Sequence, residues 1–125
     1  MIQYNNIYDY ISIDAELIAL LDNDGIAWSI KPENQIIGIL YKMISSPRIE
    51  GSDATWQRWR FTIEASTVSK SKMIANRLME LLHNIRGDVG GCLINYSFNI
   101  MDSDPELDGD TKRYTIEQDY RISTH

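Results

Sequence analysis

The clearest alternation of hydrophobic and polar residues lies between positions 58 and 65. Trp59 and Phe61 fall on one side of an extended chain there, whereas Arg58 and Arg60 fall on the other. A period of two is typical of a β-strand that packs one face against a core. We therefore expect a strand whose second face, which carries Trp56 with the two arginines, meets water or a partner.

Four further segments show the composition or the alternation of strands. The segment 36–44 is rich in aliphatic residues, which predicts a strand covered on both faces. In the segment 92–100, every second residue from Cys92 to Ile100 is apolar or aromatic and is expected to face the core. The strands predicted in this way cover residues 26–30, 36–44, 92–100 and 114–122.

Two segments place apolar residues at helical spacing. The first covers residues 14–22, with Asp14 as a candidate N-cap and Gly25 as a left-handed stop. The second covers residues 68–85, begins after a Ser-Thr pair and ends before a glycine-rich turn at 87–91. Both segments therefore predict amphipathic helices that bury one side.

The order helix, three strands, helix, two strands predicts an α+β fold. We expect an antiparallel or mixed sheet of about five strands with two helices packed on one face. Because 125 residues is close to the usual length of one domain, residues 1–125 are expected to form a single domain. A long mobile loop at 46–55 and an acidic hairpin at 102–110 are expected to connect strands.

Charge is distributed unevenly along the chain, whose net charge is −6. Residues 1–30 hold five acidic residues and no Lys or Arg, whereas residues 31–90 hold nine basic and six acidic residues. The acidic balance counts against a protein that binds nucleic acid by neutralising phosphates. We expect no secretory signal and no membrane span, and the single Cys92 excludes an internal disulfide.

The acidic hairpin does not fit a calcium-binding loop. A loop that starts at Asp104 would place Gly109 at the sixth position but Thr115 at the twelfth, where a bidentate Glu is required. His83 and His125 are too few to form a metal site by themselves, and we expect no metal and no cofactor. The carboxylates of the hairpin are Asp102, Asp104, Glu106, Asp108 and Asp110.

The order of several short segments resembles that of a known family. They are a helix that ends in an acidic turn, an aliphatic strand, an aromatic strand, a long helix, a turn of sequence Ile-Arg-Gly-Asp-Val-Gly-Gly and a last strand, at residues 17–25, 41–46, 59–65, 68–85, 85–91 and 113–122. Over residues 10–123 this ordered set resembles the small tail-completion proteins of long-tailed bacteriophages and prophages, also described as tail terminators or head-to-tail joining proteins.

The resemblance implies a structural virion protein and not an enzyme. Such proteins form a ring, typically a hexamer, on the last ring of the tail tube, where they stop tube growth and present the docking surface for the head connector. The implied partners are copies of the chain, the tail tube protein and the head connector or neck proteins, with DNA passing through the ring without specific binding. The implied location is the tail or neck of the virion, after assembly in the host cytoplasm and without a membrane.

The resemblance also implies two groups of site residues. The acidic hairpin is expected to line the channel, where its charge repels DNA, or to face a partner. Arg beside Trp is enriched at protein interfaces, and it is also suited to stacking on nucleic-acid bases or to a solvated sheet face. The residues expected at a subunit or tube interface are Arg48, Glu50, Asp53, Trp56, Arg58 and Arg60.

Two other functions remain open at this stage. Another neck component, such as a head completion, connector or stopper protein, would share the size, the ring symmetry and the α+β architecture. A small α+β enzyme or ligand-binding module would need a pocket with convergent polar groups. For that second alternative the sequence offers only scattered carboxylates and two poorly placed histidines.

Overall fold

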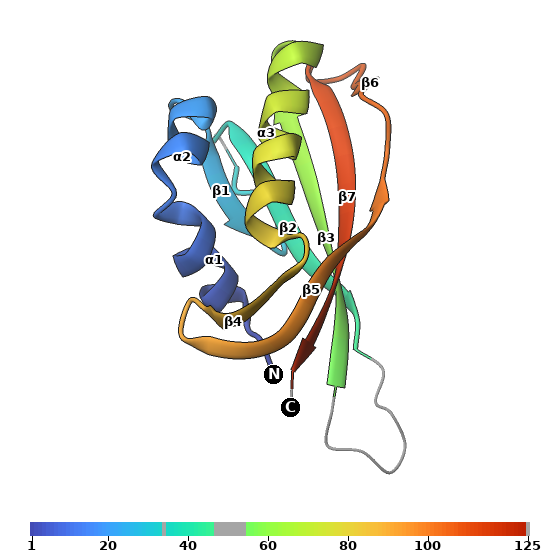
Figure 1. The fold of residues 1–125 in the computed structure, drawn as a ribbon. Coiled ribbons are helices and arrows are strands. Elements are labelled where there is room, and N and C mark those ends of the chain that lie inside the picture. The colour runs from blue at the N-terminus through green and yellow to red at the C-terminus, as the bar shows by residue number, and fades with distance from the viewer. Residues whose placement is uncertain (34, 47–54, 125) are drawn as a thin grey trace.

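The computed structural model describes residues 1–33, 35–46 and 55–124 and shows a curled sheet with helices on one face (Figure 1). In these residues the sheet has seven strands in the order β1-β2-β3-β7-β5-β4, with β6 paired to β7. Only β1 and β2 pair in parallel within this described sheet. The elements are α1 (Tyr4–Ser12), α2 (Ala15–Leu21), β1 (Gly25–Trp28), β2 (Ile37–Ser45), β3 (Thr55–Ala65), α3 (Val68–Leu82), β4 (Ile85–Val89), β5 (Cys92–Asp102), β6 (Glu106–Leu107) and β7 (Tyr114–Thr124).

The α+β class is confirmed, but the described residues hold three helices and seven strands instead of two and about five. The sequence pattern does not predict helix α1, because only Ile7 and Ile11 are buried in it and no Ser, Thr or Asp precedes it. Strand β4 occupies part of the segment whose glycines predict a turn. The tight turn is shorter and lies at Gly90 and Gly91, both with positive φ.

The predicted helix caps are confirmed in two cases and wrong in a third. The carboxylate of Asp14 accepts a hydrogen bond from Leu17 N at 2.9 Å, and the hydroxyl of Thr67 accepts one from Lys70 N at 3.1 Å. The left-handed residue after α2 is Asp22, with φ of 57°. Gly25 instead begins β1, so the helix stops without a glycine cap.

The two strands next to the first helices are less buried than the sequence predicts. The first half of β2 is buried on both faces, but Lys42 and Met43 in its second half are exposed. The segment predicted as a strand over residues 26–30 ends at Trp28, which is exposed, as is Ile30. Strand β1 is exposed because it lies at the edge of the sheet and has a neighbouring strand on one side only.

The prediction that alternate residues of β5 all face the core is wrong. The pairing of β5 with β4 shifts register between Ile94 and Ser97, and its pairing with β7 shifts between Asn99 and Met101. Each shift inserts an extra residue in β5 and exchanges the two faces. Ile94 stays buried and the half-buried Cys92 packs against the core, whereas the predicted core residues that do not face it are Tyr96, Phe98 and Ile100.

The core lies between the helices and the inner face of the sheet. Tyr41 of β2 stacks on Phe61 of β3 with ring centroids 5.3 Å apart, and Phe61 meets Tyr120 of β7 edge-on at 5.4 Å. The hydroxyl of Tyr41 donates to the carbonyl of Tyr4 in α1 at 2.7 Å, which ties the first helix to the sheet. The helices cover this face with Ile7, Ile11, Leu17, Leu21, Ile74, Leu78 and Leu82, all buried.

Candidate interaction surface

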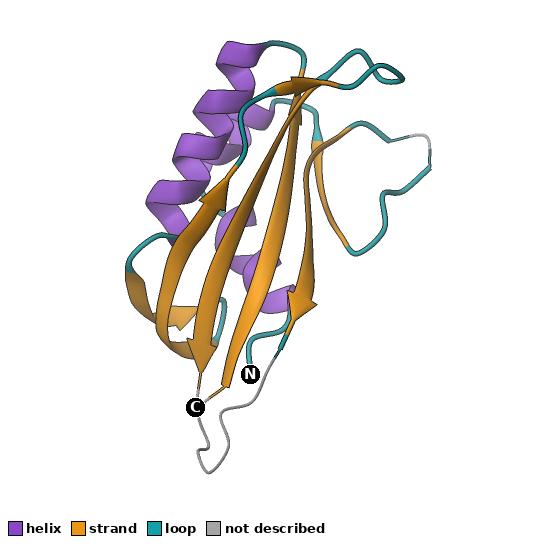
Figure 2. Ribbon diagram, turned by 90° about the vertical axis from the view of Figure 1, so that its right-hand side faces the viewer, coloured by secondary structure: helices purple, strands orange, loops and turns teal. Residues whose placement is uncertain are grey.

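The face of the sheet away from the helices is open (Figure 2) and carries the described residues that the sequence places at an interface. Trp56, Arg58 and Arg60 alternate in β3 with the buried Gln57 and Trp59, so that they lie together on this outer face. The side chains of Arg58 and Arg60 are 37% and 32% exposed. The prediction that these three residues share one face of a strand is therefore confirmed.

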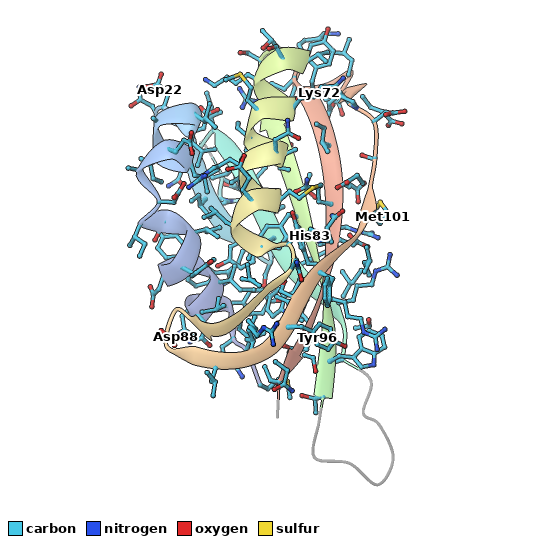
Figure 3. All side chains as sticks on the ribbon, viewed as in Figure 1. Asp22, Lys72, His83, Asp88, Tyr96 and Met101 are labelled. Atoms are coloured by element: carbon cyan, nitrogen blue, oxygen red, sulfur yellow. The ribbon has the colours of Figure 1, made fainter. Side chains whose placement is uncertain are left out.

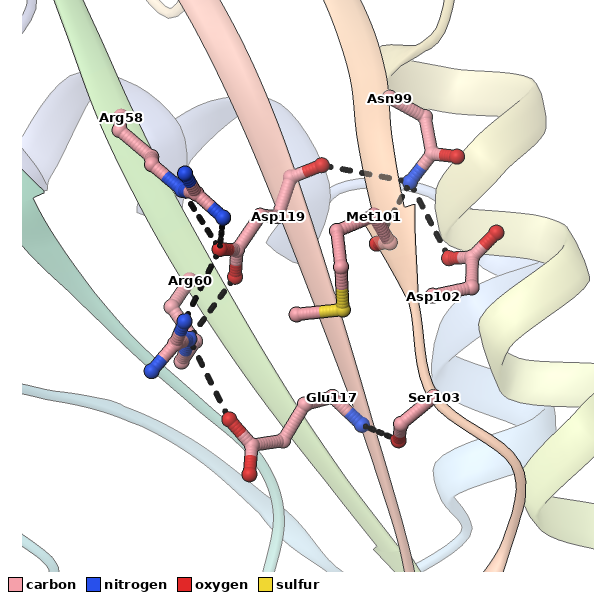
Figure 4. Close-up of polar contacts among 8 residues, drawn as sticks. All are labelled: Arg58, Arg60, Asn99, Met101, Asp102, Ser103, Glu117 and Asp119. Carbon is pink, nitrogen blue, oxygen red and sulfur yellow. Dashed lines mark hydrogen bonds and ion pairs between the residues drawn. The ribbon is translucent and has the colours of Figure 1, made fainter.

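Asp119 of β7 lies opposite Arg60 and binds both arginines (Figure 4). Arg58 Nε donates to Asp119 Oδ2 at 2.7 Å, and Arg60 donates from Nε and Nη2 to the two carboxylate oxygens at 2.9 and 3.0 Å. The Asp119 side chain is 0% exposed. Burial acts to raise the pKa of Asp119, but the hydrogen bonds from Arg60 and Arg58 outweigh it and hold the pKa below its ordinary value. Asp119 is therefore ionised at neutral pH.

Two neighbours complete the surroundings of this ion pair. Arg60 Nε also lies 3.2 Å from Glu117 Oε2, while Glu117 N donates to the hydroxyl of Ser103 at 2.8 Å. Met101 of β5 pairs with Asp119 across the strands, and its side chain lies beside that of Asp119 in Figure 4. The carboxylate is thus flanked by arginines from β3 and by a methionine from β5.

Arg121 is a cation of a different kind. Its guanidinium lies over the ring of Trp56, with Cζ 4.2 Å from the ring centroid, which is a cation–π contact. Among the described residues no carboxylate lies within ion-pair distance of Arg121. Within the same residues its buried Nε has no hydrogen-bond partner. The outer face therefore combines an ion pair satisfied from within the chain with cations, Arg121 and the exposed Lys42 opposite Arg60, that have no ion pair among the described residues.

Aromatic residues of β5 extend this surface beyond β7. Tyr96 and Phe98 pair with Ser123 and Arg121 of β7, and their rings lie 5.2 Å apart. Phe98 is 38% exposed, and Figure 3 places Tyr96 and Met101 along the same strand. We use the name Arg–aromatic face for the set Trp56, Arg58, Arg60, Tyr96, Phe98 and Arg121.

The sequence analysis missed Asp119 and Arg121 as site residues. Both belong to the polar side of the last strand, which the alternation in residues 114–122 makes visible. The missing information was the pairing of β7 with β3, which places Asp119 opposite Arg60 and Arg121 opposite Arg58. Since these paired residues lie about 60 positions apart in the chain, no local pattern indicates this register.

The acidic segment 102–110 joins β5 to β7 and contains β6, which the sequence analysis did not predict. Asp102 accepts a hydrogen bond from Asn99 Nδ2 at 3.1 Å. Asp108 accepts backbone hydrogen bonds from Asp110 and Thr111 at 2.8 and 3.3 Å, which lower its pKa. The side chains of Asp104, Glu106 and Asp110 are exposed.

Other parts of the expected site lie elsewhere or outside the described residues. Arg48, Glu50 and Asp53 belong to residues 47–54, which the structure does not describe. In the described ranges, no group of three or more His, Cys, Asp or Glu is arranged to hold a metal ion. Every helix there is too short or too polar to cross a bilayer.

The surface hollows formed by the described residues measure ≈190 to ≈540 Å³ and are not lined by groups with a shifted pKa. One of ≈190 Å³ lies between α3 and the segment after β5, with Lys72, Asp102 and Asp104 in its lining. Ligand pockets are usually about 300–1,000 Å³ and hold a few convergent polar groups. The carboxyls with lowered pKa are those of Asp14, Asp108 and Asp119. They are engaged with Arg77, with backbone N–H groups and with the β3 arginines, and none of them lines this hollow.

Comparison with known proteins gives a similarity of fold. No protein-family model and no curated protein sequence matches the chain. Among solved structures, 12 chains match. One of them belongs to a structure described as "Virion of native gene transfer agent (GTA) particle"; it has a TM-score of 0.69 and 11% sequence identity and covers 94% of this chain and 90% of that chain. At this identity the similarity establishes a common fold.

Proposed function

We propose that residues 1–125 form one structural subunit of a phage-like virion, which caps the tail tube as a ring, stops tube growth and presents the docking surface for the head connector. The observation that carries this proposal is the fold shared over 94% of the chain with a protein of a gene transfer agent virion. A fold can host many functions. The ordered segments that resemble tail terminators supply the second, independent argument.

The Arg–aromatic face is the proposed contact surface of this subunit. Trp, Tyr and Arg are the residues most enriched where binding energy concentrates at protein interfaces. This surface also holds a cation, Arg121, with no ion-pair partner among the described residues. We assign contacts with a neighbouring subunit or with the tail tube protein to Arg48, Glu50, Asp53, Trp56, Arg58 and Arg60.

The acidic segment has a proposed role in the channel or at a partner. With a net charge of −6, a ring of such subunits repels the phosphates of a passing genome, so DNA slides through and does not bind specifically. Exposed carboxylates on a connecting hairpin suit this role, because the fold does not require them to form ion pairs within the chain. The residues assigned to this role are Asp102, Asp104, Glu106, Asp108 and Asp110.

A second candidate is another neck component, such as a head completion, connector or stopper protein. It is favoured by the fact that the matching chain is described only as part of a whole virion, without a position in it. The alternative of an α+β enzyme or ligand-binding module has weaker support. The hollow beside α3 is small, and the described residues gather no set of groups with shifted pKa around it.

Electron microscopy of particles from cells that lack this protein tests the proposal. Overlong tail tubes are expected, because tube growth then has no stop. Tubes of normal length that fail to join heads would assign the chain to the neck, and normal particles would exclude both roles.

A pair of complementing variants adds a matched control. Trp56→Ala removes the ring that Arg121 covers and is expected to leave tails defective. Met73→Ala changes an exposed side chain of α3, on the opposite side of the sheet, and is expected to restore normal tails. Equal rescue by both variants would remove the Arg–aromatic face from the proposal.

A further inference from the structure

We infer that the Arg–aromatic face of one copy binds the outer side of helices α1 and α2 of the next copy, head to tail. The inference rests on the proposed ring and deepens it, because it names the two different surfaces that meet between neighbouring subunits. The two surfaces lie on opposite sides of the sheet, as Figures 1 and 2 show together. The occupant of the open sheet face is therefore a second copy of this chain.

The sheet side of the contact offers positive charge and aromatic surface. Arg58 and Arg60 form ion pairs with Asp119 and Glu117, with distances of 2.7 to 3.2 Å between arginine Nε and carboxylate oxygen atoms. Arg121 has no such partner among the described residues and is held in place by the ring of Trp56. A fixed cation of this kind loses little conformational freedom when it meets a carboxylate.

The helical side of the contact offers the opposite charge. Residues 1–30 carry five acidic residues and no Lys or Arg. Arg77 and Arg113 reach over to neutralise Asp14 and Asp24. Asp9 of α1 has no ion pair among the described residues, and its side chain is exposed.

Exposed apolar residues accompany these carboxylates on the helices. Ile13, at the junction of α1 and α2, is 80% exposed. It lies four positions after Asp9, a spacing that places both on one side of the helix. Glu16 of α2 is also exposed, although it shares Arg77 with two other acids, and Asp22 lies at the C-terminal end of α2 (Figure 3). Acidic and aliphatic groups here match the arginine and aromatic groups of the sheet face.

The charge pattern selects a head-to-tail contact over a symmetric one. Two Arg–aromatic faces placed against each other would bring together two Arg121 cations, and two α1–α2 faces would bring together the exposed carboxylates of two Asp9 side chains. A contact between two different surfaces repeats around a ring when the rotation closes. Each contact need not be tight, because closure makes the last association intramolecular, with an effective concentration in the millimolar range.

The experiment uses two variants, each of which breaks one side only. Arg121→Glu reverses the charge of Arg121 on the sheet face and leaves α1 and α2 unchanged. The double variant Asp9→Lys/Ile13→Lys reverses the helical side and leaves the sheet face unchanged. Neither change removes an ion pair of the described residues, so folding is expected to persist, as circular dichroism would verify. Lys72→Glu, an exposed reversal on α3, is the matched control.

Sedimentation equilibrium at low salt, with samples up to about 1 mM to reach the affinity range of ring contacts, measures the association. The wild-type chain and Lys72→Glu are expected to associate equally, and more weakly as salt screens the charges. Each of the other variants alone is expected to associate at least about tenfold more weakly. Their equimolar mixture is expected to associate again, because it contains one unaltered pair of surfaces and a second pair in which both charges are reversed and still attract.

Several results would overturn the inference. These are a wild-type chain that stays monomeric over the whole range, an Arg121→Glu variant that associates like the wild type, and a mixture that gives no dimer. Binding of a single-stranded oligonucleotide that Arg121→Glu abolishes would assign the face to nucleic acid instead. Normal tails without the protein would remove the proposed function while leaving a measured head-to-tail contact intact, so the two failures are distinguishable.

Discussion

The two faces of strands β3 and β7 come from the same alternating segments but are stabilised by different interactions. Toward the helices, Phe61 and Tyr120 are buried against apolar and aromatic neighbours. Away from the helices, Arg58 and Arg60 enclose the ionised carboxylate of Asp119. The inner face is complete within the chain, whereas Arg121 on the outer face still lacks an anionic partner among the described residues. The same sheet therefore supplies the core on one side and the proposed contact surface on the other.

Truncation at the centre of the inner face is expected to give the largest loss of stability. Phe61→Ala removes a fully buried ring between Tyr41 and Tyr120. Lost burial and the cavity left behind should lower the free energy of unfolding by about 3–5 kcal/mol, as urea denaturation would measure. Thr62→Ala, one position along on the outer face, should change it by less than about 1 kcal/mol. Similar losses from both would contradict the distinction between the two faces.

Removal of the buried charge from the outer face is expected to have the next largest effect. Asp119→Asn keeps the size of the side chain but removes the buried charge that Arg58 and Arg60 share, leaving Arg60 with Glu117 alone. A loss of about 2–3 kcal/mol in the free energy of unfolding is expected, since hydrogen bonds between charged groups are lost while both arginines stay partly solvated. Glu117→Gln, which alters a more exposed partner of Arg60, should cost less than about 1 kcal/mol. If Glu117→Gln costs as much as Asp119→Asn, the ion pair is not centred on Asp119.

Lowering the pH should reveal the same difference between the inner and outer faces, with a smaller change in the free energy of unfolding. The pKa values of Asp119 and Asp14 are lower in the folded chain than in the unfolded one, because arginines bind their ionised forms. Their contribution to stability is therefore complete above the unfolded pKa of about 4 and is lost as pH falls through the lower folded values. Each such group contributes a slope of up to about 1.4 kcal/mol per pH unit.

The variant Asp119→Asn provides the comparison for this titration. Denaturation between about pH 2 and 5 should show a shallower loss of stability for the variant than for the wild type. The inner-face variant Phe61→Ala should retain the wild-type slope, since it removes no titratable group. Parallel curves for the wild type and Asp119→Asn would show that Asp119 does not have the lowered pKa assigned to it.

Several elements could be predicted from local pattern because their burial is one-sided and their ends carry caps. The helix that begins after Thr67 and the strand with Trp59 and Phe61 are of this kind. Helix α1 could not be predicted from local pattern, because its burial depends on contacts with distant parts of the chain. Asn6 of α1 donates to the carbonyl of Gly90 at 2.9 Å, and a Cβ at Gly90 would collide with the Asn6 backbone.

In the sheet, strand β5 shows the same limit of prediction from local pattern. Its sequence alternates without interruption, yet two register shifts turn Phe98 and Ile100 away from the core. A bulge is decided by how a strand must bend to pair with both of its neighbours, and this bend does not appear in hydrophobic periodicity.

The sequence by itself determined the α+β class, the core side of β3 and the acidic balance, because each depends on composition or on neighbours within a few positions. Tertiary structure alone decided that Asp119 neutralises Arg58 and Arg60 and that the guanidinium of Arg121 lies over the ring of Trp56. The physical reason is that cross-strand register joins residues about 60 positions apart. Charge compensation depends on distances of a few ångströms, which the order of residues in the chain does not specify.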